Sequence, residues 1–445
     1  MNPGGAWGWV QETPPDCLII LIFGTIWFII YYADQFKRWG TLSIGAWLIG
    51  FDFYLKIIFM YPFAYSKENM HDVAQKFYII LAHLDQALRI SAVGALAMMF
   101  GMLISGARQS DKVSKILDSL HDVLLRGWCN SRGATVAGGL VLGITVLLLG
   151  LGFKPFVARD MVFDRPDLRP IYNLWSQLVP FAAICIGTYG LRVRSSLMVA
   201  IAASIGIAGG LFGGNRTMTV FTLVQLWIIW SMPDRRRSLL LPLGGAGALA
   251  ILGLMISTLR GDGGSHSSQE MSGLDELLYG SNFSDLRDFA WILSGLYDHY
   301  YMGLTYLAGY LAFIPTFLLD FRYTMAFGRV STLLAGLDPS RHGGLRPPLF
   351  GELYVNFAYP GVVLGGAAFG VLLGKILGWV SRALEGADRG RYSPHVAVLT
   401  GFLAYDVSTT LIFTPGFYFN YVLAALIGTG LALARWRPLV RLPSR

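Results

Sequence analysis

The residues in this chain best suited to chemistry are the arginines and histidines of one polar segment, residues 260–350. This segment interrupts long apolar runs and contains no lysine. Arginine binds phosphate and pyrophosphate through two parallel hydrogen bonds, so the segment predicts binding of an anion. A general preference for arginine across the chain explains the same bias equally well. The basic residues are Arg260, His266, Arg287, His299, Arg322, Arg329, Arg341, His342 and Arg346.

A second candidate anion site lies at the glycine-rich turn Gly213-Gly214-Asn215-Arg216-Thr217. Consecutive glycines allow a tight turn, and Arg216 adds positive charge to the start of the next predicted helix. Arg260 lies one predicted hairpin further along and on the same face, so both side chains can share one anion. The alternatives are an Arg216 that reaches lipid headgroups and an Arg260 that forms a surface ion pair with Asp262.

The loop 339–348 and the helix predicted after it form the strongest candidate site. Glu352 and Asn356 are four residues apart, which places them on one helix face. A glutamate at the start of a membrane helix is costly unless it serves a function, although the helix dipole also favours it there. We interpret five residues of this region as functional: Arg341, His342, Arg346, Glu352 and Asn356.

A further polar group follows residue 284, where Ser284 or Asp285 can cap a helix. Arg287, Ser294 and Asp298 can share one face of that helix. An amphipathic helix with a solvated polar side accounts for the same pattern.

The elements that must position these residues are membrane helices. The apolar share is 54%, the charged share 14% and the mean hydropathy +0.53. Apolar windows of about 20 residues recur along the chain, which predicts an all-α polytopic membrane protein. The predicted spans number about eleven: Cys17–Tyr32, Leu42–Met60, Phe77–Ile104, Ala134–Phe153, Ile171–Tyr189, Ser196–Phe212, Met218–Trp230, Leu239–Thr258, Leu353–Leu377, Val396–Phe413 and Phe417–Ala434.

The loop charges predict the orientation of these spans. Basic residues concentrate in alternate short loops, which places those loops in the cytoplasm and the N-terminus and Arg260 outside. An even number of crossings is then needed between Thr258 and Leu353. We therefore expect Tyr301–Leu319 to be a re-entrant or interfacial helix, the alternative being a span paired with a second crossing. The predicted parts are residues 1–258 (bundle), 259–350 (large external loop) and 351–445 (C-terminal helices).

Other classes of site have no support in the sequence. The formal charge of +8 falls in short loops between spans, so nucleic acid is not an expected partner. Cys17, Cys129 and Cys185 are scattered and are expected to be packing residues. No zinc pattern, P-loop or nucleophile elbow occurs, and neither a metal nor a cofactor is expected. The first apolar run lacks the features of a cleaved signal and is expected to be a retained span.

The second half of the chain resembles the bacterial O-antigen polymerases, or oligosaccharide repeat unit polymerases (Wzy-type). The resemblance rests on Gly213-Gly214-Asn215-Arg216, on Tyr310-Leu311-Ala312-Phe313-Ile314-Pro315, and on the stretch from Gly343-Gly344 through Gly351-Glu352-Leu353-Tyr354-Val355-Asn356-Phe357 to Gly361. The order of the three motifs carries it. Ala358 departs from the pattern, since the family usually has glycine there, and the path of the helix is open at that point.

This resemblance implies glycosyl transfer at the periplasmic face of the inner membrane by a GT-C-like fold, without a metal. The donor would be a glycan on undecaprenyl pyrophosphate, and the acceptor a hydroxyl of one lipid-linked repeat unit. Glu352 or His342 would accept the proton. Membrane lipids and a chain-length regulator protein are the other partners implied. The residues expected to bind pyrophosphate or glycan are Arg216, Arg260, Arg287, Arg341, Arg346, Tyr354 and Asn356.

Two other functions remain open. An O-antigen ligase uses the same donor and delivers the glycan to a lipid core. A transporter or flippase of lipid-linked sugars requires charged residues inside spans, for which Asp52, Lys56 and Asp406 are the candidates. Lys56 can also simply pair with Asp52 one turn away.

Overall fold

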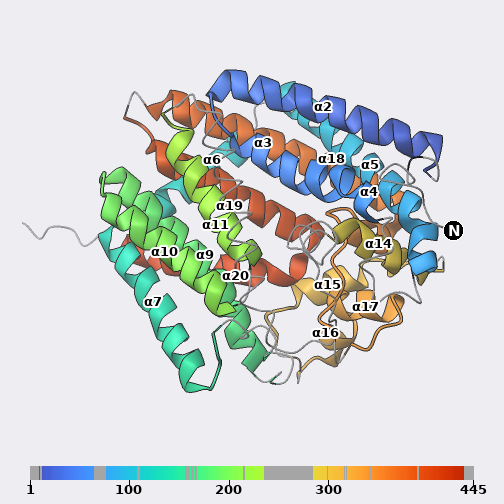
Figure 1. Cartoon of the computed structure of the whole chain (residues 1–445). Helices are drawn as coiled ribbons and strands as arrows, with labels where there is room; N and C mark the ends of the chain where they lie inside the picture. The colour runs from blue at the N-terminus through green and yellow to red at the C-terminus, as the bar shows by residue number, and fades with distance from the viewer. Residues whose placement is uncertain are drawn as a thin grey trace, which may run out of the picture. The chain divides into compact units, whose positions relative to one another are not determined.

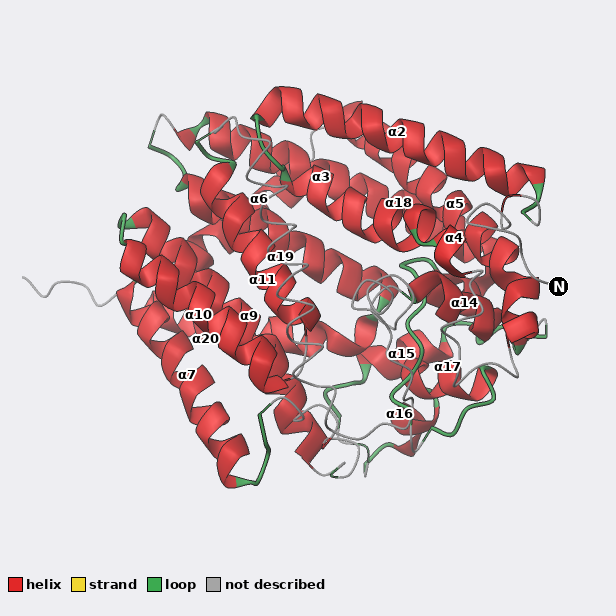
Figure 2. Ribbon diagram, viewed as in Figure 1, coloured by secondary structure: helices red, strands yellow, loops and turns green. Residues whose placement is uncertain are grey.

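The computed structural model describes residues 10, 13–64, 77–107, 111–155, 161, 165, 168–213, 216–234, 284–297, 299–314, 316, 318–339, 342–387 and 390–434. Over these residues the chain forms helices joined by turns and loops, with no strand (Figure 2). The all-α prediction is therefore confirmed for the described part of the chain.

Eight helices in the described ranges are long and apolar enough to cross a membrane, as expected of a polytopic membrane protein. Each coincides with a predicted span, and each is labelled in Figure 1. They are α2 (Pro15–Trp39), α5 (Phe77–Ala107), α7 (Ser131–Gly150), α9 (Arg169–Arg192), α10 (Ser196–Gly213), α18 (Gly351–Glu385), α19 (Pro394–Phe413) and α20 (Tyr418–Leu433), the last preceded by the short turn η7 (Pro415–Phe417).

The other three predicted spans differ from these eight. Leu42–Met60 becomes the short helix α3 (Ile44–Ile49) followed by a ten-residue π-helix, η1 (Gly50–Phe59). Met218–Trp230 becomes α11 (Arg216–Ser231), which is apolar but has only 16 residues. Leu239–Thr258 lies outside the described residues. The total of eleven spans therefore stays a prediction.

The chain divides into two compact units, which are interleaved in sequence. Unit 1 comprises residues 1–109, 261–375 and 405–418, and unit 2 comprises residues 110–260, 376–404 and 419–445. Three of the boundaries fall inside helices, one each in α18, α19 and the first turn of α20. The predicted division at residues 258 and 350 follows the chain, whereas the units are each assembled from three separate segments.

In unit 1, α5 and α18 pack closely through small residues. A side chain at Gly370 of α18 would collide with the backbone oxygen of Met98 in α5, and one at Gly101 would collide with that of Ala367. Small residues at a helix interface let two backbones approach, which is a usual way for membrane helices to associate. This contact fixes α18, whose first turn carries Glu352.

The polar segment, from residue 284 onward, adds four short helices to unit 1: α14 (Asp285–Ser294), α15 (Leu304–Tyr310), α16 (Asp320–Thr324) and α17 (Phe327–Leu334). At about 1.5 Å per residue, α15 is about 10 Å long and cannot cross a hydrocarbon core of about 30 Å. The stretch Tyr301–Leu319 therefore contains no spanning helix in its described residues. A further short helix, α4 (Tyr61–Ala64), follows η1.

Unit 2 is built around α7, α9, α10 and α11, which lie side by side (Figure 1). Their shared core contains the buried aromatic side chains of Phe153, Tyr172, Trp175 and Phe212. The stretch Leu117–Trp128 forms the end of α6 (Asp111–Val123) and the π-helical turn η3 (Leu124–Trp128).

Candidate functional site

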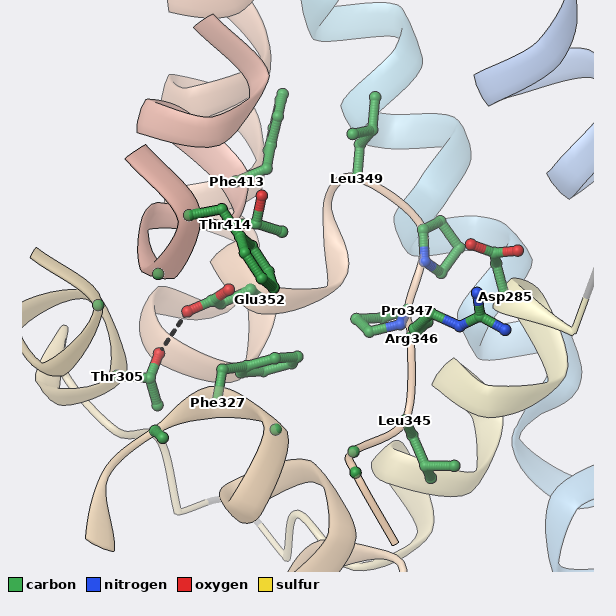
Figure 3. Close-up of a pocket in the computed structure, with 18 of the residues that line it drawn as sticks. Asp285, Thr305, Phe327, Leu345, Arg346, Pro347, Leu349, Glu352, Phe413 and Thr414 are labelled. Atoms are coloured by element: carbon green, nitrogen blue, oxygen red, sulfur yellow. Dashed lines mark hydrogen bonds between the residues drawn. The ribbon is translucent and has the colours of Figure 1, made fainter. Parts of the chain in front are cut away.

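Unit 1 encloses a cavity of about 500 Å³ next to the start of α18. Its wall combines acidic, basic and apolar side chains from segments far apart in the sequence (Figure 3). The contributing elements are η1, α14, α15, α16, α17, the loop before α18, the first turn of α18 and the α19–η7 connection. The charged and hydroxyl side chains on the wall are Asp52, Lys56, Asp285, Thr305, Arg322, Arg346, Glu352 and Thr414.

At one end of the cavity, Glu352 is held by uncharged partners. Its side chain is 3% exposed, and its Oε1 accepts a hydrogen bond of 2.7 Å from the hydroxyl of Thr305 in α15 (Figure 3). Asn356, one turn further along α18, donates from Nδ2 to the same Thr305 hydroxyl at 2.7 Å. The prediction that Glu352 and Asn356 share a helix face is confirmed, since both side chains reach Thr305.

The local backbone of α18 explains how Thr305 is brought to Glu352. The helix is broken at Ala358, where φ is 53° and ψ is −152°, and Pro360 follows. Because proline has no N–H, the carbonyl of Asn356 cannot be bonded within the helix at Pro360. That carbonyl instead accepts the N–H of Met302 at 3.0 Å, and the Val355 carbonyl accepts the N–H of Tyr301 at 3.1 Å.

These two bonds attach the segment before α15 to α18. Gly303 then turns with φ at 85°, a conformation that glycine adopts without strain, and its N–H donates to Asn356 Oδ1 at 3.1 Å. Thr305 follows in the first turn of α15. The break in α18 thus supplies the backbone groups that place Thr305.

At the other end of the cavity, the charged side chains have charged partners. Lys56 Nζ lies 2.9 Å from Asp52 Oδ1 in the same π-helix and 3.8 Å from Asp285 Oδ1 at the start of α14. The second oxygen of Asp52 accepts the hydroxyl of Tyr405 in α19. Lys56 is thus placed between two carboxylates, and the predicted pairing of Lys56 with Asp52 is confirmed.

Two arginines complete the cavity wall, in different settings. The side chain of Arg346 extends toward Asp285 (Figure 3), and its backbone N–H donates to Asp288 Oδ2 at 3.2 Å. Arg322 donates to the carbonyl of Ile314 and forms no ion pair with an acidic residue of the described ranges. The charge of Arg322 is therefore the less compensated of the two.

Burial governs the titration of the groups on α14. Burial raises the pKa of Asp288 to about 6, although the neighbouring Arg287 acts in the opposite direction. Burial also raises the pKa of Asp285, against the charges of Lys56 and Arg346. Burial lowers the pKa of Arg287. The two acidic residues of this helix, Asp285 and Asp288, thus hold their protons more tightly than in water.

Of the residues predicted to act, Glu352 and Arg346 line the cavity. Asn356 is fully buried behind Thr305 and contacts Glu352 through its own backbone turn. Tyr354 is also buried, among Phe289, Tyr300 and Tyr359, and Gln86 donates to its hydroxyl at 3.4 Å.

Three other predicted residues can be placed and do not join Glu352. Arg287 is on α14 and His342 is exposed on the loop before α18, and neither lines the cavity. Arg216 begins α11 in unit 2, and its side chain lies outside the described part of the structure. Ser294 donates to the Trp291 carbonyl of its own helix.

The remaining predicted residues fall outside the described ranges. These are Arg260, Arg341 and Asp298. No group of three metal-ligating side chains occurs among the described residues. Cys17, Cys129 and Cys185 are buried without disulfides, as expected of packing residues.

Sequence reasoning did not assign Thr305, Arg322 or Asp285 to the site. Asp285 was visible only as a possible helix cap, and the side chain of Ser284, the residue at the cap position, makes no capping bond. Asp52 and Lys56 gave a signal, because two opposite charges four residues apart in an apolar run are costly without a purpose. Thr305 gave none, since a lone threonine in an apolar stretch is ordinary.

The arrangement can do acid–base chemistry on an anionic substrate. A buried carboxylate with one oxygen engaged can accept a proton with the other. Cations within the same cavity can bind a negatively charged group.

No protein-family model, curated protein or solved structure matches this chain.

Proposed function

We propose that this protein polymerises oligosaccharide repeat units carried on undecaprenyl pyrophosphate, at the periplasmic face of the bacterial inner membrane. The observation that carries the proposal is the cavity of unit 1, where buried Glu352 shares one space with Lys56, Arg322 and Arg346. A volume of about 500 Å³ lies within the range of small-ligand sites. The candidate membrane helices would accommodate the polyprenyl chains.

In this reaction a hydroxyl of the acceptor sugar attacks the anomeric carbon of the donor glycan. The hydroxyl proton passes to Glu352, a new glycosidic bond forms, and the bond to pyrophosphate breaks. Undecaprenyl pyrophosphate leaves as an anion, which a cation of the cavity stabilises. Arg322 is best suited to that role, because Lys56 and Arg346 each face Asp285. Arg216, Arg260 and Arg341 remain predicted contacts for the pyrophosphate.

The proposal is tested by reconstituting the purified protein in liposomes. The substrate is the lipid-linked oligosaccharide extracted from source cells whose copy of the gene has been deleted. Polymerisation gives a ladder of products, whose formation Glu352→Gln should strongly reduce. Glu385→Gln, an exposed position at the far end of the same helix, is the matched control and should give the full ladder.

Other outcomes identify other functions. Transfer of a single glycan to an added lipid core, without a ladder, identifies a ligase. Movement of the lipid-linked sugar across the liposome, without a new glycosidic bond, identifies a transporter. The Asp52–Lys56 pair on the cavity wall favours the transporter as the second candidate, since charges within an apolar run often mark a transport path.

A further inference from the structure

The hydrogen bonds around Thr305 have a direction that the chemistry of the groups determines. The N–H of Gly303 can only donate, so the Asn356 atom that it meets must be the amide oxygen. The amide nitrogen of Asn356 then faces Thr305 and donates to its hydroxyl oxygen at 2.7 Å. A hydroxyl has one proton, and that of Thr305 is directed to Glu352 Oε1 at 2.7 Å.

The three side chains of this network are almost completely shielded from water. Thr305 is 1% exposed, Asn356 0% and Glu352 3%. Breaking one buried bond leaves its partner unsatisfied, so the orientation of each group is strongly preferred. Glu352 Oε1 is therefore fixed as an acceptor, while Oε2 has no hydrogen-bond partner among the described residues.

We propose that Thr305 and Asn356 are positioning residues that reserve Glu352 Oε2 as the oxygen that takes the proton of the substrate hydroxyl. Asn356 is thereby reassigned from substrate binding to the support of Glu352. The identity of the substrate rests on the proposed function. The relay, meaning the hydrogen bonds from Asn356 to Thr305 and from Thr305 to Glu352, does not depend on it.

The step balances at named atoms. The O–H bond of the acceptor sugar breaks as its oxygen bonds to the anomeric carbon, and the proton moves to Oε2. The bond from that carbon to the pyrophosphate oxygen breaks, and its electron pair leaves with the pyrophosphate. The Thr305 proton stays on its own oxygen throughout, where it stabilises the carboxylate before the transfer.

Few other titratable groups face Glu352. Tyr306 and Tyr310 of α15 respond to its charge: burial, followed by the charge of Glu352, raises the pKa of both. Charged groups further along the wall come from η1, α14, α16 and the loop before α18: Asp52, Lys56, Asp285, Arg322 and Arg346. The test must therefore remove the Thr305 bond without altering any of these charges.

Thr305→Val removes the hydroxyl and keeps the shape, whereas Thr305→Ser keeps the hydroxyl. We expect Thr305→Val to lower kcat by about 10- to 100-fold with little change in KM, as found for groups that orient an active residue. The acidic limb of its pH–rate profile should move to higher pH, because the carboxylate loses a donor. Thr305→Ser should restore both the rate and the profile.

A second measurement does not require polymerase activity. Dicyclohexylcarbodiimide modifies protonated carboxyl groups in apolar sites, and the labelling of Glu352 can be followed by mass spectrometry as a function of pH. Labelling should persist to higher pH in Thr305→Val than in the wild type, and Thr305→Ser should match the wild type.

The outcomes separate the two ideas. If the wild-type protein makes no ladder but labelling of Glu352 persists to higher pH in Thr305→Val, the role of the Thr305 hydrogen bond stands and the proposed polymerase is overturned. Unchanged labelling in Thr305→Val overturns the relay, whatever the activity. Equal losses in Thr305→Val and Thr305→Ser also overturn it, because packing alone would then explain the effect.

Discussion

The two ends of the cavity in unit 1 hold their carboxylates in opposite ways. The side chain of Glu352 accepts a hydrogen bond from the hydroxyl of Thr305, and that hydroxyl accepts one from the amide of Asn356. Asp52 and Asp285 share the ammonium group of Lys56, and Asp52 also accepts the hydroxyl of Tyr405. One end thus has a carboxyl group with no ionic partner among the described residues, while the other has charges that largely cancel.

This difference indicates that Glu352 has a chemical role and that the carboxylates around Lys56 have a structural one. A carboxylate held by neutral donors keeps its basicity and can exchange a proton with a substrate. A carboxylate bound to a lysine has its charge compensated, and its main effect is to connect η1 with α14. We therefore expect substitutions at the Glu352 end to affect the rate, and substitutions at the Lys56 end to affect stability.

The largest expected effect is on the rate at the Glu352 end. Glu352→Gln should reduce ladder formation by about 10²- to 10⁴-fold, the usual contribution of a general base. Asp285→Asn should retain most of the activity, since Lys56 keeps Asp52 as its partner. Initial rates in liposomes measure both variants, and equal losses would remove the contrast between the two ends.

The next effect is on stability at the Lys56 end. Lys56→Met leaves two carboxylates near each other in a partly buried site, which should cost about 3 kcal/mol. Thermal unfolding in detergent measures the loss. The triple variant Asp52→Asn, Lys56→Met, Asp285→Asn removes all three charges and should recover most of it. A single variant as stable as the wild type would show that the cluster is not structural.

The effect of pH on stability tests the raised pKa of the buried residue Asp288. Burial raises the pKa of Asp288 from 3.8 to about 6, so the folded state binds its proton more tightly than the unfolded state. The stability from this group is fully present below pH 3.8 and is lost as the pH rises through about 6. The difference of about two units corresponds to about 3 kcal/mol at most.

Asp288→Asn lacks this titration but keeps an oxygen that can accept the Arg346 N–H. The variant should therefore gain stability relative to the wild type between pH 4 and 7. Melting temperatures at several pH values measure this, and parallel curves for the two proteins would contradict the burial argument.

The smallest expected effect concerns the break that supports the Glu352 end. Ala358 has a backbone conformation that is strained for any residue with a side chain, at about 1–3 kcal/mol. Ala358→Gly should raise stability by about 1 kcal/mol after the added flexibility of the unfolded chain is subtracted. Ala358→Val should lower it. Thermal unfolding of both variants gives the comparison, and a loss on Ala358→Gly would rule out strain at this position.

The sequence predicted the parts of the fold that depend on local pattern. Apolar length located the helices, and the spacing of Glu352 and Asn356 predicted their common face. The family resemblance marked Ala358 as a point where the path of the helix was open, and the structure breaks the helix at that residue. Each of these features follows from residues close together in the chain.

The rest of the site depends on contacts that sequence distance conceals. Thr305 reaches Glu352 only because the Asn356 carbonyl, left unbonded by Pro360, holds Met302. Lys56 meets Asp285 across more than 200 positions in the chain. The predicted site favoured residues near one another or of one type, and it therefore included His342 and Arg287, which do not line the cavity.

The break at Ala358 also separates two mechanical roles within α18. The part before it places Glu352 on the cavity wall, and the longer part after it is apolar enough to respond to the thickness of the bilayer. The part of α18 before the break is hydrogen-bonded to α15 and to the segment that precedes it. A change in tilt of the later part therefore need not move Glu352. The site should thus keep its geometry across lipid compositions that reorient the helix below it.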